Sequence, residues 1–291
     1  MALVLVLWVL VLLALIAAAF LSETRSGMVA ATHRQGAARA EALADGGVHW
    51  ALWRLLSADV PRGGTPTLPL DGRPVTRDLD GGRVAVRVRD VYGRIDLNVA
   101  EARTLARLLV AVGVPDSRAR TLTARIQDYR EPAGRGAGGP DGAYARAGLA
   151  YGPKGGRFAT PAELAMVPGI SADLTARLRP HLTVLSGTRA LDPQAATALA
   201  LHANGAVGRE AAADYVARRA AAPFDAPPAP PNGGRFLTSP RHSFTITARA
   251  QAPGGGVFTR TATVRLDPVQ GDAPYRILDW RQAVPLRAPE R

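Results

Sequence analysis

Cysteine is missing from this chain of 291 residues, and lysine occurs only once, as Lys154, among 36 basic residues. The absence of cysteine excludes a disulfide-stabilised scaffold, a zinc site built on thiolates and a cysteine nucleophile. The scarcity of lysine changes the meaning of the net charge of +12. Arginine in place of lysine, with abundant Ala, Gly and Pro, is the composition that a GC-rich genome encodes. The charge therefore does not by itself predict a nucleic-acid partner.

Charge, proline and glycine are also missing between Ala2 and Leu21. Twenty helical residues span roughly 30 Å, the thickness of a bilayer's hydrocarbon core, so we predict a membrane span at about residues 2–21. A cleavable secretory signal is the alternative, because Ala17–Ala19 resembles a cleavage site, but no basic residue precedes the apolar stretch. The arginines that follow would place the rest of the chain in the cytoplasm, unless a basic leader has been removed before Met1.

A helix followed by strands is predicted next to this span. The helical pattern continues from Glu23 to Leu56, across Gly46 and Gly47. Residues Arg83–Arg89 alternate strictly between polar and apolar, as in a half-buried strand. Three later segments predict strands, the first two joined by a hairpin at Pro253–Gly256: His242–Ala250, Val257–Leu266 and Tyr275–Trp280.

Residues 96 to 235 have a helical pattern instead, and parts of it repeat. Predicted helices run over Glu101–Val112, from an N-cap at Asp116 to Tyr129, from a capping box at Thr160–Glu163 to Val167, over Ser171–Leu178, and more weakly from Leu191 to Ala221. The motif Ile95–Ala100 partly recurs as Leu191–Ala196. A Pro/Gly-rich linker at 223–235 returns to the sheet.

The segment between the strands indicates one sheet with a helical insertion. We therefore predict an α+β fold: a helix at 1–57, a small antiparallel sheet domain formed by 58–95 and 236–291, and an inserted all-α domain with its linker at 96–235.

The turn Val167–Ile170 between two short helices is similar to a helix-hairpin-helix, a module with which many proteins bind DNA phosphates through glycine N–H groups. The position of the second glycine holds Ser171. A compact hairpin packed through its apolar residues is therefore favoured over a phosphate site; these residues are Leu164, Val167, Ile170 and Leu174.

No pattern of catalytic residues is present. The five histidines lack metal-ligand spacing, no G-x-S-x-G occurs, and we expect a non-enzymatic protein. The loop after the second predicted helix carries Asp128, Glu131 and Asp141 beside several glycines. Hard oxygen ligands on a loop suit Ca²⁺, so these three residues are the candidate calcium ligands; a solvated loop is the alternative, since arginines lie among them.

Taken together, these segments resemble a family, the K-type minor pseudopilin of bacterial type II secretion (general secretion pathway protein K). The resemblance covers nearly the whole chain. It rests on Met1–Val4 with Leu7–Leu10, Arg39–Gly47, Gly93–Asn98 with Ala100, Ile126–Arg130, and Phe158–Gly169 followed by His181–Val184.

The resemblance implies a pilin-like fold with helix-hairpin-helix-like units in the insertion. It also implies removal of a short basic leader by a prepilin peptidase, methylation of the new amino terminus, and a single-pass protein of the inner membrane with its globular part in the periplasm. The implied partners are the I- and J-type minor pseudopilins, the major pseudopilin and membrane lipid. The implied role is at the tip of the pseudopilus, supporting its assembly and the export of folded proteins.

Leu5 supports the tip position. Other pseudopilins carry a glutamate there, which pairs with the amino terminus of the next subunit up, and a carboxylate in lipid is tolerable only when paired. Leu5 lacks that charge, as a subunit with no neighbour above it allows. The alternative function is a membrane-anchored DNA receptor that uses its helix-hairpin-helix units; nucleic acid is the less favoured partner.

Overall fold

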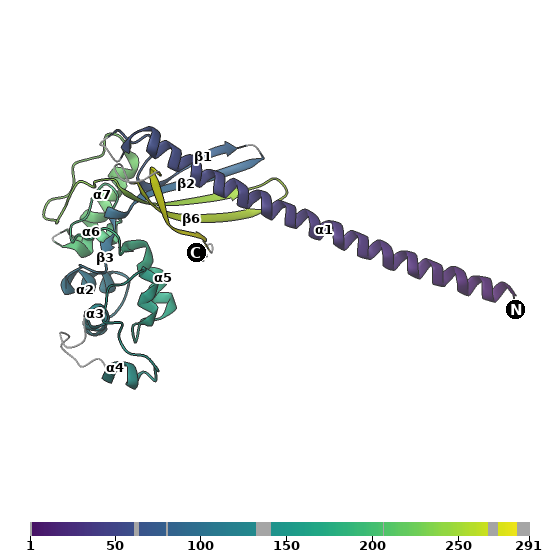
Figure 1. Ribbon diagram of the computed structural model, residues 1–291, viewed down its shortest axis with the longest axis horizontal. Coiled ribbons are helices and arrows are strands. Elements are labelled where there is room, and N and C mark those ends of the chain that lie inside the picture. Colours follow the sequence, from purple (N-terminus) through teal and green to yellow (C-terminus); the bar gives the residue numbers. More distant parts are fainter. Residues whose placement is uncertain are drawn as a thin grey trace.

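A computed structural model describes residues 2–60, 64–79, 81–131, 141–205, 207–266 and 273–283, with the side chains of 18–31 and of 141–142 left undescribed. A single helix, α1 (Ala2–Ser57), extends far beyond the rest of the molecule, as Figure 1 shows. The apolar side chains from Leu3 to Ile16 are all exposed on it. Over the described residues, no helical stretch meets the length and hydropathy needed to cross a bilayer.

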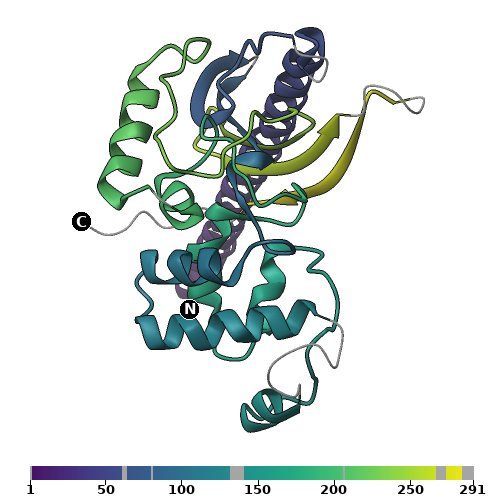
Figure 2. The same ribbon diagram turned by 90° about the vertical axis from the view of Figure 1, so that its left-hand side faces the viewer.

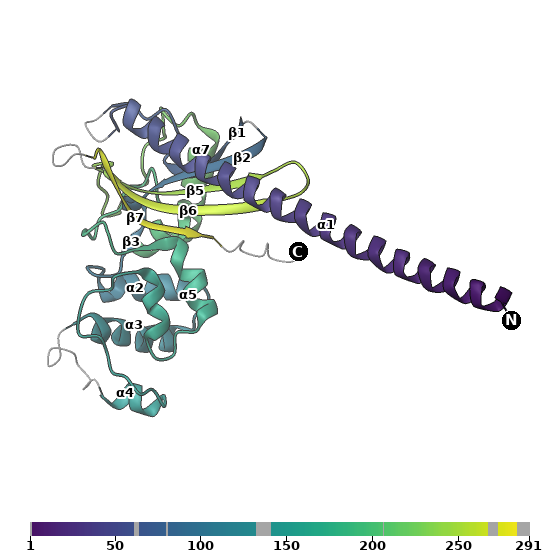
Figure 3. The ribbon, with the colours of Figure 1, turned by 45° about the vertical axis from the view of Figure 1, so that its right-hand side comes forward.

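The distal part of α1 lies along a five-stranded antiparallel sheet (Figure 3). Its strands follow the order β1-β2-β5-β6-β7, with bounds Asp71–Leu79, Gly82–Asp90, Ser243–Gln251, Val257–Leu266 and Tyr275–Gln282. The small antiparallel sheet and its four predicted strands are confirmed. The first strand, β1, was not predicted, because it contains Gly72 and Pro74 and the register shifts between Asp71 and Pro74.

The core between α1 and the sheet combines Ala, Val and Leu residues of the helix with aliphatic residues and one phenylalanine of the strands. Ala44, Val48 and Ala51 are buried on α1, opposite valines of β2 and apolar residues of β5 and β6. Gly47 is part of this contact, because a Cβ there would lie 2.6 Å from Val84 Cγ1 and 3.1 Å from Ala248 Cβ. The glycine in mid-helix therefore allows the close approach of helix and sheet, which offsets its low helix propensity.

A buried arginine also joins the sheet to α1. Arg260 of β6 donates hydrogen bonds to Asp45 at 2.6 Å and to Glu41 at 2.7 Å. Its guanidinium lies over the rings of Phe258 and Trp280, at 4.8 and 5.3 Å from their centroids. The hydrogen bond that Arg260 donates to Asp45 is the main cause that raises the pKa of Arg260. The arginine therefore stays charged and fixes the register of the helix against β6.

A helical segment lies between β2 and β5 in the chain, although these two strands pair directly from Arg83–Gln251 to Asp90–Phe244. It begins with a short 3₁₀ turn, η2 (Val91–Gly93). Its helices are α2 (Ala102–Ala111), α3 (Asp116–Arg130), α4 (Asp141–Arg146), η3 (Pro161–Met166), α5 (Ala172–Leu178), η4 (Arg179–His181), α6 (Ala198–Asn204) and α7 (Arg209–Ala221). Two short parallel strands join it, β3 (Ile95–Asp96) and β4 (Leu182–Thr183).

The helical segment has its own core, separate from that under α1. Figure 2 shows α2 and α3 below the sheet and α4 farthest from it. Two local predictions need correction. Asp116 is the first helical residue of α3 and not its N-cap, which is Pro115, and the helix after the predicted capping box is 3₁₀ and not α. The capping box itself is confirmed, since Glu163 accepts the N–H of Thr160 at 3.2 Å.

Candidate functional site: two repeated joints

The repeated sequence motif forms the same turn twice. The first joint comprises residues 95–100 and the second joint residues 191–196. In each, the aspartate accepts an N–H on Oδ1 from the residue two positions later: Asp96 from Asn98 and Asp192 from Gln194, both at 2.8 Å. The carbonyl of each aspartate accepts an N–H from four residues later, at 2.8 and 3.1 Å. The partial sequence repeat is therefore a repeat of structure.

The second oxygen of each aspartate holds a segment that returns from the following helices. Asp96 Oδ2 accepts the N–H of Gly187 at 2.8 Å, and Asp192 Oδ2 accepts the N–H of Ser239 at 3.0 Å. Each joint also pairs in parallel with its returning segment, the first with β4 and the second at Phe236. Each aspartate thus closes a loop that begins and ends at its own joint.

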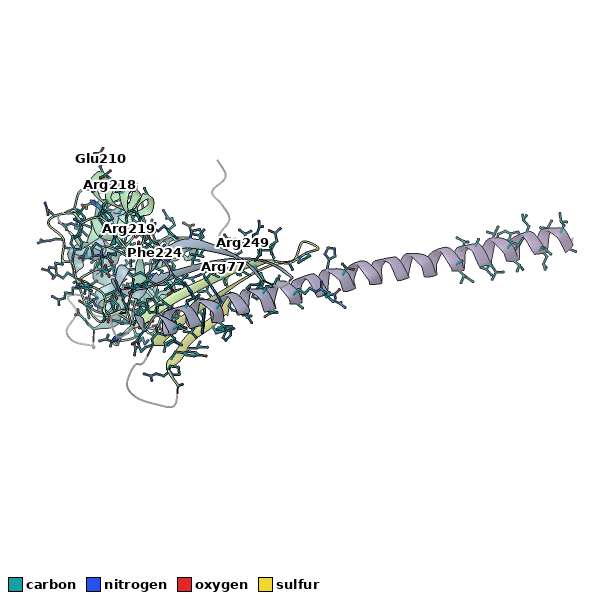
Figure 4. All side chains as sticks on the ribbon, turned by 90° about the horizontal axis from the view of Figure 1, so that it is seen from above. Arg77, Glu210, Arg218, Arg219, Phe224 and Arg249 are labelled. Carbon is teal, nitrogen blue, oxygen red and sulfur yellow. The ribbon has the colours of Figure 1, made fainter. Side chains whose placement is uncertain are left out.

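A buried or half-buried arginine completes each joint from the helix that follows. Arg130, the last residue of α3, donates to the carbonyls of the third and sixth residues of the first joint. Arg219, near the end of α7, donates to the same two positions of the second joint, at 2.5 and 2.9 Å. Charge-assisted bonds of this kind are stronger than neutral ones. Figure 4 labels Arg219 on α7.

The first joint has an additional brace. The amide of Asn98 donates to the carbonyl of Phe158 at 3.0 Å and accepts its N–H at 2.7 Å. The Phe158 ring stacks on Tyr129 with centroids 4.7 Å apart. The segments resembling the secretion family, at 93–98, 126–130 and 158, are therefore in mutual contact, and each has a structural role.

The second joint lies against the end of the sheet, where buried charges gather around a cavity of about 260 Å³. Asp71 of β1 pairs with Arg73 at 2.9 Å and with Arg219 at 3.5 Å. Asp90, the last residue of β2, accepts the hydroxyl of Ser239 at 2.6 Å. Because Ser239 also donates its N–H to Asp192, this serine connects the sheet to the second joint.

Burial raises the pKa of Asp90 to about 6, and repulsion from Asp192 adds to the shift, while the hydrogen bonds from Ser239 and Tyr92 and the nearby Arg241 oppose it. Burial also raises the pKa of Asp192. A carboxyl whose pKa is higher in the folded state binds its proton more tightly there than in the unfolded chain. Ionisation of Asp90 therefore destabilises the fold above pH 6, and this loss of stability disappears as the pH falls from about 6 towards 4.

We expect Asp90→Asn to increase the free energy of unfolding at pH 8 by on the order of 3 kcal/mol, which corresponds to a pKa shift of about two units. The gain should shrink towards zero at pH 4. Thermal unfolding of the full chain in nonionic micelles between pH 4 and 8 measures it. Asp214→Asn, which changes an exposed carboxylate on α7, should show no such pH-dependent gain; an equal gain in both variants would contradict the assignment to Asp90.

The candidate calcium ligands lie at the end of α3 and beyond it. Asp128 is in the last turn of α3 and Glu131 directly follows the helix, whereas the side chain of Asp141, at the start of α4, lies outside the described residues. Burial raises the pKa of Asp128, and the carboxylate of Glu131 adds to it. The described side chains include no group of three His, Asp or Glu that could hold a metal ion. Two of the three predicted ligands are thus close enough to repel each other.

The helix-hairpin-helix-like turn faces inward. Leu164, Val167, Ile170 and Leu174 are all buried, as predicted for a compact hairpin. The turn's carbonyls accept bonds from α3: Arg125 donates to Pro168 at 2.9 Å and Arg118 to Gly169 at 3.1 Å. The DNA-binding alternative gains no support from this arrangement.

Another residue of the family resemblance, His181, is half-buried beside the first joint. Its Nδ1 lies 2.7 Å from the hydroxyl of Thr197. Burial lowers its pKa to about 4, with repulsion from Arg89 and Arg94 adding to the shift. The ring is therefore neutral near pH 7 and is part of the packing between the two joints.

Comparison with known proteins agrees with this geometry. The family of type II secretion system protein K matches residues 88–187, from the end of β2 to the closure of the first joint. A chain in the crystal structure of the GspK–GspI–GspJ complex from the enterotoxigenic Escherichia coli type 2 secretion system has a similar fold, with a TM-score of 0.56 and 18% sequence identity. The match covers 90% of this chain and 99% of that one. A comparison with curated proteins finds no match. The resemblance drawn from the sequence is confirmed over residues 88–187, which match the family of type II secretion system protein K.

Proposed function

We propose that this chain is a minor pseudopilin of type II secretion that acts at the tip of the pseudopilus and supports both its assembly and the export of folded proteins. The observation that carries the proposal is the family match over residues 88–187, which includes the whole first joint. The long helix packed on a small sheet, with a bulky helical segment at the far end, suits a subunit that terminates a fibre. The arrangement offers binding surfaces, and the described residues give no set of catalytic groups.

The amino-terminal part of α1 would anchor the protein in the inner membrane and pack against neighbouring subunits. Its side chains from Leu3 to Ile16 are apolar and exposed, and twenty such residues would span roughly 30 Å. With a prepilin peptidase acting before Met1 and the amino terminus then methylated, the globular part would lie in the periplasm. Leu5 in place of the usual glutamate is consistent with a subunit that has none above it.

The expected partners are the I- and J-type minor pseudopilins, followed by the major pseudopilin. The solved complex in which a chain of similar fold occurs contains GspK, GspI and GspJ. One test is co-purification of the full chain with the I- and J-type proteins of the same organism, which should form a stable complex. The other test compares a strain that lacks this gene with the same strain after the gene has been returned. We expect secretion to be lost without the gene and restored with it; normal secretion without the gene would contradict the proposal.

A calcium ion near the end of α3 remains a prediction. Asp128 and Glu131 would supply carboxylate oxygens, and a divalent cation would relieve their mutual repulsion, which adds to the effect of burial on the pKa of Asp128. We expect millimolar Ca²⁺ to raise the melting temperature of the full chain by a few degrees relative to a chelator, because a ligand that binds only the folded state stabilises it. The double variant Asp128→Asn/Glu131→Gln should lose this rise, whereas Asp173→Asn on α5 should keep it. The same rise in the double variant would refute the site.

A further inference from the structure

The two joints allow a comparison of equivalent residues in the helices that follow them. After the second joint come Thr197, Leu199 and Ala203; the equivalent positions after the first joint hold Glu101, Arg103 and Arg107. Thr197 caps α6 by accepting the N–H of Ala200. Glu101, at the N-cap of α2, makes no such bond. We call each joint together with the helix that follows it a unit: the first joint with α2, and the second joint with α6. The first unit therefore has charged residues at positions where the second unit has residues that cap and pack its helix.

Glu101 instead holds two arginines from other parts of the chain. Its Oε1 pairs with Arg235 at 2.5 Å and with Arg189 at 3.4 Å. The hydrogen bond from Arg235 is the main cause that lowers the pKa of Glu101. Arg189 is further fixed by donating its Nε–H to the carbonyl of Val99 at 3.0 Å. One carboxylate thus places two guanidinium groups beside the start of α2.

Glu101 and these two arginines line a groove of about 330 Å³ where the first unit meets the end of α6. Its walls carry four arginines, at 103, 107, 189 and 235, and two carboxylates, Glu101 and Asp96. Both oxygens of Asp96 already accept hydrogen bonds inside the first joint. Over the described residues, no carboxylate forms an ion pair with Arg103 or Arg107, so the groove has an excess of positive charge.

We propose that this groove binds an acidic segment of a partner protein, whose carboxylates pair with Arg103 and Arg107. The carboxylate of Glu101 already shows which anion the groove accommodates, and the planar guanidinium group matches a carboxylate in a two-bond pair. The choice of a protein as the occupant rests on the proposed function, because a pseudopilus subunit meets other subunits and exported proteins. The groove would hold a short acidic stretch and not a folded domain.

The test uses the full chain in nonionic micelles and fluorescein-labelled hexaglutamate, followed by anisotropy at low and high salt. The double variant Arg103→Gln/Arg107→Gln is expected to bind at least tenfold more weakly than the wild type. The matched control, Arg83→Gln/Arg249→Gln, removes the same charge from the sheet, where Figure 4 labels Arg249, and should change the Kd less than twofold. The wild type and the control variant should both bind hexaglutamate more weakly at high salt.

Three results would overturn the proposal: equal binding by the groove variant and the wild type, equal weakening by the control variant, or displacement of the peptide by inorganic phosphate or a short DNA duplex at lower concentration than by unlabelled hexaglutamate. A chain that assembles with the I- and J-type proteins but does not bind hexaglutamate refutes the groove and leaves the proposed function intact. Failure to assemble refutes the proposed function whatever the peptide result.

Discussion

Replacing Arg219 by Met is expected to lower the free energy of unfolding by about 3 kcal/mol, because removing one partner of a buried ion pair strands the other groups. Only 5% of Arg219 is exposed. Its side chain bonds two carbonyls of the second joint and pairs with the buried Asp71 at 3.5 Å. Methionine fills much of the same volume but leaves both carbonyls unsatisfied and Asp71 with one ion-pair partner fewer.

The adjacent residue on α7, Arg218, provides the control. Figure 4 labels both arginines. Arg218 is more than half exposed and, among the described residues, forms an ion pair with Asp214 of the same helix. An exposed pair of this kind contributes little, so Arg218→Met should change the free energy of unfolding by less than about 0.5 kcal/mol. Denaturant unfolding of the full chain in micelles, followed by circular dichroism, measures both. Equal midpoints for the two variants would show that Arg219 does not hold the second joint.

The sequence predicted those parts of the fold that have a periodic pattern. Strict alternation predicted β2, because one face of this strand is buried against α1, and the turn at Pro253–Gly256 predicted the hairpin of β5 and β6. β1 escaped prediction for the opposite reason. It is an edge strand with Pro74 at a register shift and few apolar residues, so neither alternation nor composition distinguishes it from a turn.

The joints were visible in the sequence only as a weak repeat. The recurrence of Asp at the second position pointed to them, since each aspartate makes the same local bonds. The arginines that complete them lie 30 and 23 residues from the last carbonyl they bond, and no local pattern distinguishes Arg219 from Arg218. Likewise, burial in the folded protein raises the pKa of Asp90, and Ser239, whose hydroxyl donates to Asp90 and opposes part of this shift, lies 149 residues away. Interactions of this kind follow from tertiary packing.

The second large effect is expected at Gly93, where the sheet ends and the first joint begins. A Cβ at this position would lie 2.4 Å from the backbone carbonyl carbon and oxygen of Ala195 in the second joint. Backbone atoms cannot turn away as a side chain does, so Gly93→Ala should force the second joint off η2. The expected loss in unfolding free energy is about 3 kcal/mol, at the upper end for an overpacked site.

Gly156→Ala is the matched control, because a Cβ at Gly156 meets no atom within 4 Å, and it should leave stability unchanged within about 0.5 kcal/mol. Chemical unfolding of both variants as full chains in micelles gives the comparison. The double variant Gly93→Ala/Arg219→Met tests the coupling between the two positions: both changes act on the second joint, so their combined cost should be smaller than the sum of the separate costs. Strictly additive costs would mean that the contact of Gly93 with Ala195 and the bonds of Arg219 stabilise independent parts of the protein, and the second joint would then not be a single structural unit.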